Sequence, residues 1–372
     1  MARIDAFLQM GREQGCSDIH FTVGLPPVGR LDNEMTPFKY RNLSEEELTS
    51  LMHEVMDAEA KAEIESRGAT DFAYEAEGLG RFRMNVYRHR RGLGAICRII
   101  TATVPRLSDL GLPPVVAEFT RIASGLVLVT GGPGTGKTTT LAAMIDEINE
   151  NENVTVMTLE DPVEILHPAK QALVVQREVG RQVRSFHEGL RSALRQDPDV
   201  ILIGEMRDAE TIAAAIEASE TGHLVFGTLH TRGAHQTIHR IVDAFPAESQ
   251  AQIRHPLADN LRAVVSQELV RNADGRGRRV VAEIMIMTPA IAQLVREGKT
   301  HQIPSSMSTG RRLGMQLLDQ TLLKLVQSGD IDPNEAFLKA VDKREFIFHV
   351  TEPALLALAD TGASGAPIRE AA

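Results

Sequence analysis

The chain has 372 residues, of which 24% are charged and 43% hydrophobic, with a formal net charge of −10 and two cysteines. This length is enough for two or three domains with buried cores, and the acidic balance excludes nucleic-acid binding through bulk electrostatics. Two cysteines exclude a disulfide framework and a four-cysteine zinc module. The N-terminus lacks a signal-peptide core and no segment has 18 consecutive apolar residues, so we expect a cytoplasmic protein without membrane spans.

The first hundred residues predict a small α+β domain. Helical spacing runs from residue 4 to 14, and a capping box at Ser44 opens a second helix over 45–56. Alternation of polar and apolar residues predicts antiparallel strands at 17–23, 71–75, 81–87 and 92–100. Residues 101–114 contain three prolines and no long period, so we interpret them as an interdomain linker.

A second domain, residues 115–288, alternates apolar strands with amphipathic helices, which is typical of an α/β fold with a mainly parallel sheet. A helical subdomain is expected over 289–350, and the tail 351–372, rich in Ala and Gly, is expected to be disordered. The strands expected in the second domain are 126–130, 154–159, 200–203, 224–228 and 280–285.

A phosphate-binding loop lies between the strand 126–130 and the helix that follows it. The sequence from Gly131 to Thr138 matches G-x-x-x-x-G-K-[ST] at every fixed position. Backbone N–H groups and the helix N-terminus favour phosphate oxygens, Lys137 can reach the β- and γ-phosphates, and Thr138 can offer a hydroxyl to Mg²⁺. We therefore expect ATP and Mg²⁺ to bind here rather than an ordinary glycine turn, through Gly131, Gly132, Pro133, Gly134, Thr135, Gly136, Lys137, Thr138 and Thr139.

Carboxylates follow two of the predicted strands. The strand 200–203 leads to Glu205, which in a parallel sheet falls beside the phosphate loop, so we interpret it as a Mg²⁺ residue. The alternative is a surface glutamate that caps the next helix. Glu160, Asp161 and Glu164 follow the strand 154–159; such a concentration of charge fits a site that faces a cation and water, or else a solvated acidic loop.

Histidine and arginine supply further candidates. His230 lies just beyond the strand 224–228, where it can contact a γ-phosphate or a carboxylate, unless it is an ordinary loop histidine. Arg81, Arg83 and Arg98 belong to an arginine-rich part of the first domain. Arg81 and Arg83 share one face of a predicted strand, and they can act as arginine fingers on phosphate. The alternatives are a solvated basic sheet face or a weak nucleic-acid patch.

The order of these motifs resembles that of a known superfamily. The phosphate loop, Glu-Asp-Pro-Val-Glu (160–164), Ile-Gly-Glu-Met-Arg-Asp (203–208) and Gly-Thr-Leu-His-Thr (227–231) look like the Walker A, Asp box, Walker B and His box of secretion ATPases. Within that superfamily the chain resembles the type IV pilus retraction ATPases, the PilT family. The segments 16–27, 81–85 and 296–305 support this, and the resemblance covers residues 3–345.

The resemblance implies a homo-hexameric ring that hydrolyses ATP to power pilus retraction, pilin disassembly and twitching motility. It implies a PAS-like domain over 1–100, a RecA-like core over 115–288, and a position at the inner membrane through a pilus platform protein, with pilin contacted indirectly. Glu164 corresponds to the general base, Glu205 to the Walker B residue and His230 to the His box. Arg81 and Arg98 match family arginines that approach phosphate, and Arg83 is a third candidate.

Two segments depart from the family pattern. The phosphate loop begins Gly-Gly-Pro-Gly-Thr-Gly where the family usually has Gly-Pro-Thr-Gly-Ser-Gly, and the family's Ala-Ile-Arg-Asn-Leu-Ile is here Ala-Ile-Ala-Gln-Leu-Val, residues 290–295. The second departure leaves open an accessory or paralogous pilus or secretion ATPase. Extension ATPases carry an extra N-terminal domain and usually a zinc module, so the start of this chain and its two cysteines favour the retraction branch. A RecA-like nucleic-acid motor and a poorly hydrolysing scaffold are further alternatives, and no specific nucleic-acid partner is expected.

Overall fold

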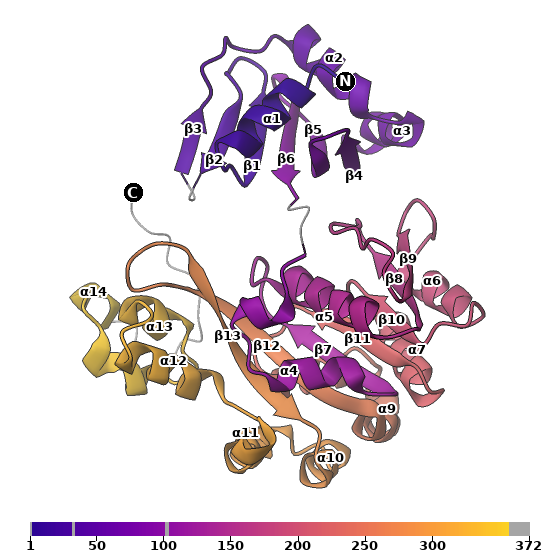
Figure 1. The fold of residues 1–372 in the computed structure, drawn as a ribbon, viewed down its shortest axis with the longest axis vertical. Coiled ribbons are helices and arrows are strands. Elements are labelled where there is room, and N and C mark those ends of the chain that lie inside the picture. Colours follow the sequence, from indigo (N-terminus) through magenta and orange to yellow (C-terminus); the bar gives the residue numbers. More distant parts are fainter. Residues whose placement is uncertain (1, 32–33, 101–103, 357–372) are drawn as a thin grey trace. The chain divides into compact units, whose positions relative to one another are not determined.

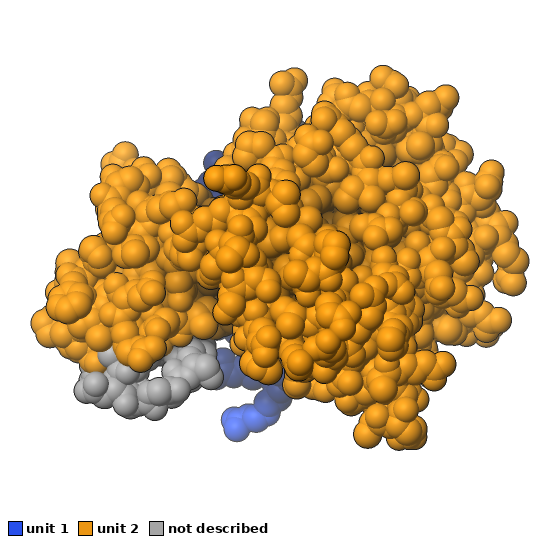
Figure 2. Space-filling view, turned by 90° about the horizontal axis from the view of Figure 1, so that it is seen from below, with its two compact units in different colours: residues 1–104, 162–166 blue, residues 105–161, 167–372 orange. Residues whose placement is uncertain are grey.

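The computed structural model describes residues 2–31, 34–100 and 104–356. They form two compact units, one within 1–104 together with 162–166, the other within 105–161 and 167–372 (Figures 1 and 2). The first unit therefore includes a short segment, Pro162–Leu166, that comes much later in the sequence than the rest of it.

The first unit contains a six-stranded antiparallel sheet in the order β3-β2-β1-β6-β5-β4. Ser44 caps α2 by accepting a hydrogen bond from the Glu47 N–H, as the capping box predicts, and Gly68 ends α3 in the left-handed conformation. The elements are α1 (Asp5–Glu13), β1 (Asp18–Thr22), β2 (Val28–Leu31), β3 (Glu34–Pro37), α2 (Glu45–Val55), α3 (Ala58–Arg67), β4 (Ala69–Ala76), β5 (Gly80–His89) and β6 (Gly92–Ile99).

The second unit contains a seven-stranded sheet in the order β13-β12-β7-β11-β10-β8-β9, parallel except for the β12–β13 pair. Every residue of β7, β10 and β11 is buried, as expected for central parallel strands covered on both faces. The strands are β7 (Gly125–Thr130), β8 (Thr155–Glu160), β9 (Leu173–Glu178), β10 (Val200–Ile203), β11 (Leu224–Leu229), β12 (Leu261–Arg271) and β13 (Arg278–Ile286).

Helices follow most of these strands. The longest of them, α5, starts at Lys137 directly after the phosphate loop. The remaining helices of the main core are α4 (Val115–Glu118), α6 (Phe186–Ala193), α7 (Ala209–Glu220), α8 (Ala234–Asp243), α9 (Ala247–Asn260), α10 (Pro289–Arg296) and α11 (Ile303–Thr309), with α5 spanning Lys137–Asn151. In the part of the chain that the structure describes, no helix is long and apolar enough to cross a membrane.

The C-terminal helices have their own small core on the β12–β13 hairpin. Val270 and Val281 of the hairpin are buried against Leu322 and Phe337 of the helices α12 (Leu318–Gln327) and α13 (Pro333–Lys339). Figure 1 shows these helices, together with α14 (Pro353–Leu356), at the end of the long hairpin. The hairpin thus joins the main sheet to the C-terminal helices.

Some boundaries differ from the sequence-based expectation. The second unit begins at Pro105, and Leu107 in the 3-10 helix Leu107–Leu110 is buried, so most of the expected linker packs onto the second unit. Residues 101–103 lie outside the described residues, as does the greater part of the expected disordered tail, 357–372. The strands β2, β3, β9 and β12 were not predicted.

Candidate nucleotide-binding site

The phosphate loop leaves the end of β7 and closes at the start of α5. Gly131, Gly134 and Gly136 have φ values of +143°, +73° and +87°, a region that favours glycine. Gly131 also packs against the neighbouring strand β12, because a Cβ atom there would lie 2.4 Å from the backbone oxygen of Gln267. The Thr135 hydroxyl donates to the Gly132 carbonyl across 2.9 Å, which closes the loop.

Lys137 lies inside this loop. Its ammonium group donates hydrogen bonds of 2.8 Å to the carbonyl oxygens of Gly131 and Gly132, and it lies 3.3 Å from Nδ1 of His230. Burial lowers the pKa of Lys137, although the charges of Glu205 and Glu268 act to raise it. Thr138 is exposed and Thr139 is half-buried in the first turn of α5, so the hydroxyl of Thr138 is open to solvent.

Glu205 and His230 come from neighbouring strand ends. Glu205 follows β10, His230 follows β11, and Oε1 of Glu205 lies 2.9 Å from Nε2 of His230. Because Nδ1 of His230 faces an ammonium donor, the geometry fits a ring that accepts at Nδ1 and donates from Nε2–H to Glu205. Lys137, His230 and Glu205 thus form one continuous chain of polar contacts.

Arg207 extends this chain on the far side of Glu205. Its Nη2 donates to Glu205 across 2.6 Å. Burial acts to raise the pKa of Glu205, but the hydrogen bond from Arg207 and the neighbouring His230 outweigh it, so the pKa is lowered and the carboxylate stays ionised. Asp208 caps α7 by accepting from the Thr211 N–H, so the alternative that Glu205 caps that helix is wrong.

The three carboxylates after β8 do not share one environment. Glu160 is buried at the end of β8 and accepts hydrogen bonds from Thr158 (2.6 Å) and Gln176 (3.1 Å). Asp161 is exposed. Glu164 belongs to the first unit, where its Oε1 lies 3.5 Å from Nη1 of Arg83.

The candidate arginines lie together on the sheet of the first unit. Arg83 of β5 stands directly opposite Arg98 of β6, and Arg81 lies two residues from Arg83 on the same face. Arg98 is paired with Asp18 at 2.9 Å, and Arg83 contacts Glu164. Like charges on facing positions repel, and these carboxylates offset that repulsion.

Sequence reasoning missed the contribution of β12. Gln267 is fully buried, its backbone touches Gly131, and its side-chain amide donates to the Thr140 hydroxyl across 2.8 Å. Glu268, the next residue, is also buried and acts on the pKa of Lys137. The signal was the polar run Ser266-Gln267-Glu268 within an apolar stretch, since buried polar side chains require specific partners.

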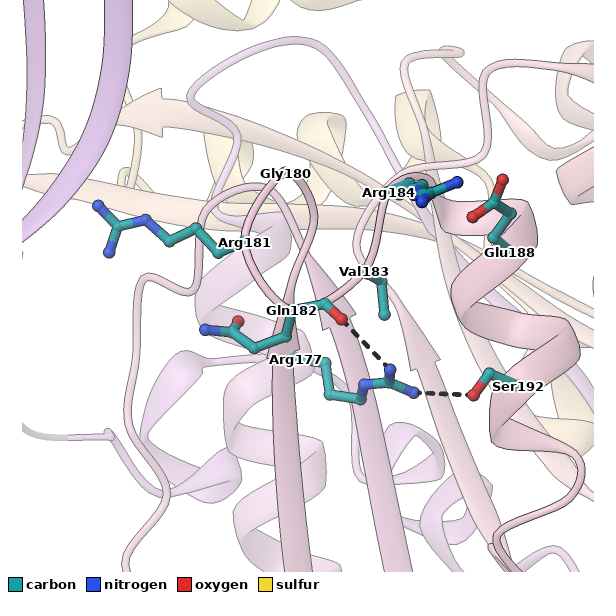
Figure 3. A pocket seen from close by; sticks show the side chains of 8 residues that line it. All are labelled: Arg177, Gly180, Arg181, Gln182, Val183, Arg184, Glu188 and Ser192. Carbon is teal, nitrogen blue, oxygen red and sulfur yellow. Dashed lines mark hydrogen bonds between the residues drawn. The ribbon is translucent and has the colours of Figure 1, made fainter. Parts of the chain in front are cut away.

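A crevice of about 420 Å³ lies between the edge strand β9 and α6 (Figure 3). Arg177 in this crevice donates to the Ser192 hydroxyl (3.3 Å) and the Gln182 carbonyl (3.4 Å), while Arg181 pairs with Glu178 at 3.2 Å. Three strands separate β9 from β7 in the sheet, so this crevice is distinct from the phosphate loop.

Similar proteins are known. A family model described as "Type II/IV secretion system protein" matches residues 113–340. The chain is 46% identical to the "Type IV pilus retractation ATPase PilT" of Pseudomonas aeruginosa, over 91% of this chain and 98% of that one. It is 44% identical to a "Twitching motility protein" of Neisseria gonorrhoeae, over 87% of this chain and 86% of that one.

A solved structure is also similar. The crystal structure of the pilus retraction motor PilT with bound ADP superposes with a TM-score of 0.85 at 42% identity, covering 93% of this chain and 98% of that one. The predicted fold class, an α/β ATPase core between a small α+β domain and a helical C-terminal subdomain, is therefore confirmed.

Proposed function

The chain belongs to the type II/IV secretion system protein family and, within it, to the type IV pilus retraction ATPases, and we propose that it hydrolyses ATP at residues 131–139 to power pilus retraction. The observation that carries the site assignment is the contact chain from Lys137 through His230 to Glu205. It joins the phosphate loop to the ends of the two strands next to β7 on one side, β11 and β10.

In this proposal Lys137 exchanges its two carbonyl acceptors for the β- and γ-phosphate oxygens of ATP. Carbonyls carry only partial charge, so phosphate oxygens are the stronger acceptors for an ammonium group. His230 lies 3.3 Å from the same ammonium group and contacts Glu205 through its other ring nitrogen. A movement of the Lys137 ammonium therefore changes the position of His230 and, through it, that of Glu205.

The residues present also fit Mg²⁺. The exposed hydroxyl of Thr138 and the ionised carboxylate of Glu205 are oxygen ligands of the type that Mg²⁺ prefers. When bound, the ion neutralises charge on the β- and γ-phosphates. Arg207 and His230 already contact the carboxylate of Glu205, which binds Mg²⁺ only through an oxygen lone pair that these contacts leave accessible. Both neighbours therefore affect how well Glu205 binds the ion.

We assign the general base to Glu164 and phosphate contacts to Arg81 and Arg98, following the family resemblance. Glu164 is paired with Arg83, and Arg98 with Asp18. The Arg83–Glu164 pair is partly exposed on both sides, and such a pair contributes at most about 1 kcal/mol, so its exchange for phosphate and water has a small energetic cost. Asp18 is buried, so the release of Arg98 costs more. Arg83 remains a third candidate because its release frees Glu164.

The same proposal includes a homo-hexamer, at the cytoplasmic face of the inner membrane, that acts on a platform protein and through it on pilin. The similarity to the solved structure of a pilus retraction motor, together with the ring that the family resemblance implies, supports assembly into an oligomer. Analytical ultracentrifugation of the purified chain with and without ATP tests the hexamer directly.

The decisive experiment measures ATP hydrolysis by the purified chain and by Lys137→Ala. The wild type is expected to turn over ATP in the presence of Mg²⁺. Lys137→Ala is expected to lose tight binding or turnover because it lacks the phosphate counter-charge, while circular dichroism remains unchanged. Wild-type turnover in the variant contradicts the site assignment, and loss of twitching in a strain without this protein tests the motor role.

A second candidate, an accessory pilus ATPase, is favoured by α10. At the two positions where the family has Arg and Asn, this chain has Ala292, which is buried, and Gln293, which donates to Glu297 across 2.6 Å. Neither presents a cationic side chain. Expression of this chain in a twitching-deficient retraction mutant separates the two roles, because an accessory motor does not restore twitching alone.

A further inference from the structure

The β12–β13 hairpin contains two buried carboxylates outside the recognised ATPase motifs. Glu268 lies on β12 and Glu283 on β13, and both are almost inaccessible to solvent. Burying a carboxylate is costly unless it is paired or hydrogen-bonded, so the partners of each one define what it does.

Glu268 joins two parts of the second unit that are far apart in sequence. One oxygen lies 3.3 Å from Nε of Arg232, two residues after His230. The other accepts from the ammonium of Lys339, at the end of α13, across 3.0 Å. A single buried carboxylate therefore contacts both the loop after β11 and the C-terminal helices.

Glu283 makes the same kind of bridge through backbone groups. Its Oε1 accepts from the Ala234 N–H at 2.7 Å, where α8 begins, and its Oε2 accepts from the Leu318 N–H at 3.4 Å, where α12 begins. Ser266 stands opposite Glu283 in the hairpin and accepts from the Gly233 N–H at 2.7 Å. The loop 230–234 is thus bonded to the hairpin at several consecutive residues.

The loop after β11 consequently has two sides. On one side His230 contacts Lys137 and Glu205; on the other, Arg232 and Ala234 contact the hairpin carboxylates. The folded state is destabilised when a buried carboxylate loses one of its partners. A shift of this loop on nucleotide binding therefore also changes the contacts that Glu268 and Glu283 make with α13 and α12.

We propose that Glu268 and Glu283 are positioning residues that couple the His230 loop to the C-terminal helices α12 and α13, so that these helices control the rate of ATP turnover without touching the nucleotide. This rests on the proposed function, in that ATP binds beside Lys137 and His230. Since coupling between two sites is reciprocal for binding, ATP also changes the stability of α12 and α13.

The first test removes the C-terminal partner of Glu268. Lys339→Met keeps an unbranched side chain of similar size but removes its charge, and it is expected to lower kcat about three- to tenfold. It is also expected to change KM, because an effect of ATP on α12 and α13 requires an equal effect of these helices on ATP binding. Lys324→Met, which removes an exposed lysine of α12, is the matched control and is expected to match wild type. Lys339→Arg, which restores the charge, is expected to recover most of the rate.

The outcomes separate the coupling from a merely structural role. A lower melting temperature with unchanged kcat in Lys339→Met overturns the proposal, as does an equal loss of rate in Lys324→Met. If the wild type itself fails to hydrolyse ATP, the proposed function fails instead, which makes the two failures distinguishable.

A second measurement needs no variant. Hydrogen exchange of the wild-type protein is recorded with and without AMP-PNP and Mg²⁺, at a concentration where protection of residues 131–139 shows that the nucleotide is bound. Slower or faster exchange in residues 318–339 is expected. Unchanged exchange there, with the phosphate loop protected, overturns the proposal.

Discussion

The glycines of the phosphate loop differ in what they require, and alanine substitution at each one tests the loop geometry. At Gly131 an added Cβ lies 2.4 Å from the backbone oxygen of Gln267 and 2.6 Å from the Thr135 hydroxyl oxygen, at a φ of +143°. At Gly136 φ is +87°, but no heavy atom lies within 4 Å of the added Cβ. At Gly132 φ is not positive and the nearest atom, Cγ2 of Thr135, is 3.9 Å away.

These differences predict a graded series. Gly132→Ala is expected to leave stability unchanged or to raise it by up to about 1 kcal/mol, because alanine restricts the unfolded chain. Gly136→Ala costs about 1–2 kcal/mol for the left-handed backbone alone. Gly131→Ala adds to its backbone strain an overlap with main-chain atoms worth about 1–3 kcal/mol, which gives about 2–5 kcal/mol in total.

Function is expected to follow the same order. The overlap at Gly131 is with the main chain of β12, which cannot rotate away, so the loop must shift and misalign its N–H groups. A shift of about 1 Å is enough to cost on the order of a hundredfold in rate. Urea unfolding and ATP hydrolysis of the three variants measure both effects, and a Gly131→Ala protein as stable and active as Gly132→Ala refutes the close approach of loop and strand.

Three further predictions concern charged groups. Glu164→Gln is expected to abolish turnover but retain Mg²⁺-dependent ATP binding, whereas Glu205→Gln weakens the Mg²⁺ dependence itself; identical Mg²⁺ titrations contradict this division of roles. Arg81→Ala is expected to lower turnover far more than the melting temperature, and ATPase activity within about twofold of wild type, a change of about 0.4 kcal/mol in barrier, rejects its phosphate role. Burial raises the pKa of Glu283 above 4.5 despite its two backbone donors, so the folded state binds this proton more tightly than the unfolded state does. The stability of the wild type relative to Glu283→Gln is therefore expected to fall as the pH rises above about 4.5. Parallel pH series of urea unfolding check this, and equal slopes for the two proteins contradict it.

The sequence predicted the elements whose patterns are set locally. Helix α2 begins after Ser44 because its capping box satisfies free N–H groups, and β10 is a purely apolar run because both faces of a central strand are covered. The strand β12 was missed because it is long and contains Ser266, Gln267 and Glu268 in a stretch that would otherwise be apolar. Those polar residues make sense only beside the phosphate loop and the C-terminal helices, which local pattern does not reveal.

The sequence predicted which strand ends carry the candidate residues but not the contacts between those residues. The motif identifies Lys137, and the strand ends identify Glu205 and His230 as neighbours, since ligand-binding residues collect at the carboxyl ends of parallel strands. Sequence does not show that Lys137 is held by loop carbonyls, nor that Arg98 is paired with Asp18. Such pairings depend on the distance between strands that are 80 residues apart in the chain, here Asp18 on β1 and Arg98 on β6.

The order of strands explains why the loop after β11 contacts both the phosphate loop and the β12–β13 hairpin. β7, which leads into the phosphate loop, lies between β11 on one side and β12 on the other. β11 delivers His230 to Lys137, while β12 supports Gly131 and places Glu268 against the loop that follows β11. Any displacement of the phosphate loop or of His230 must therefore be accommodated by the β12–β13 hairpin. Since Val270 and Val281 of that hairpin belong to the core of the C-terminal helices, the sheet provides a route by which a change at the nucleotide can reach α12 and α13.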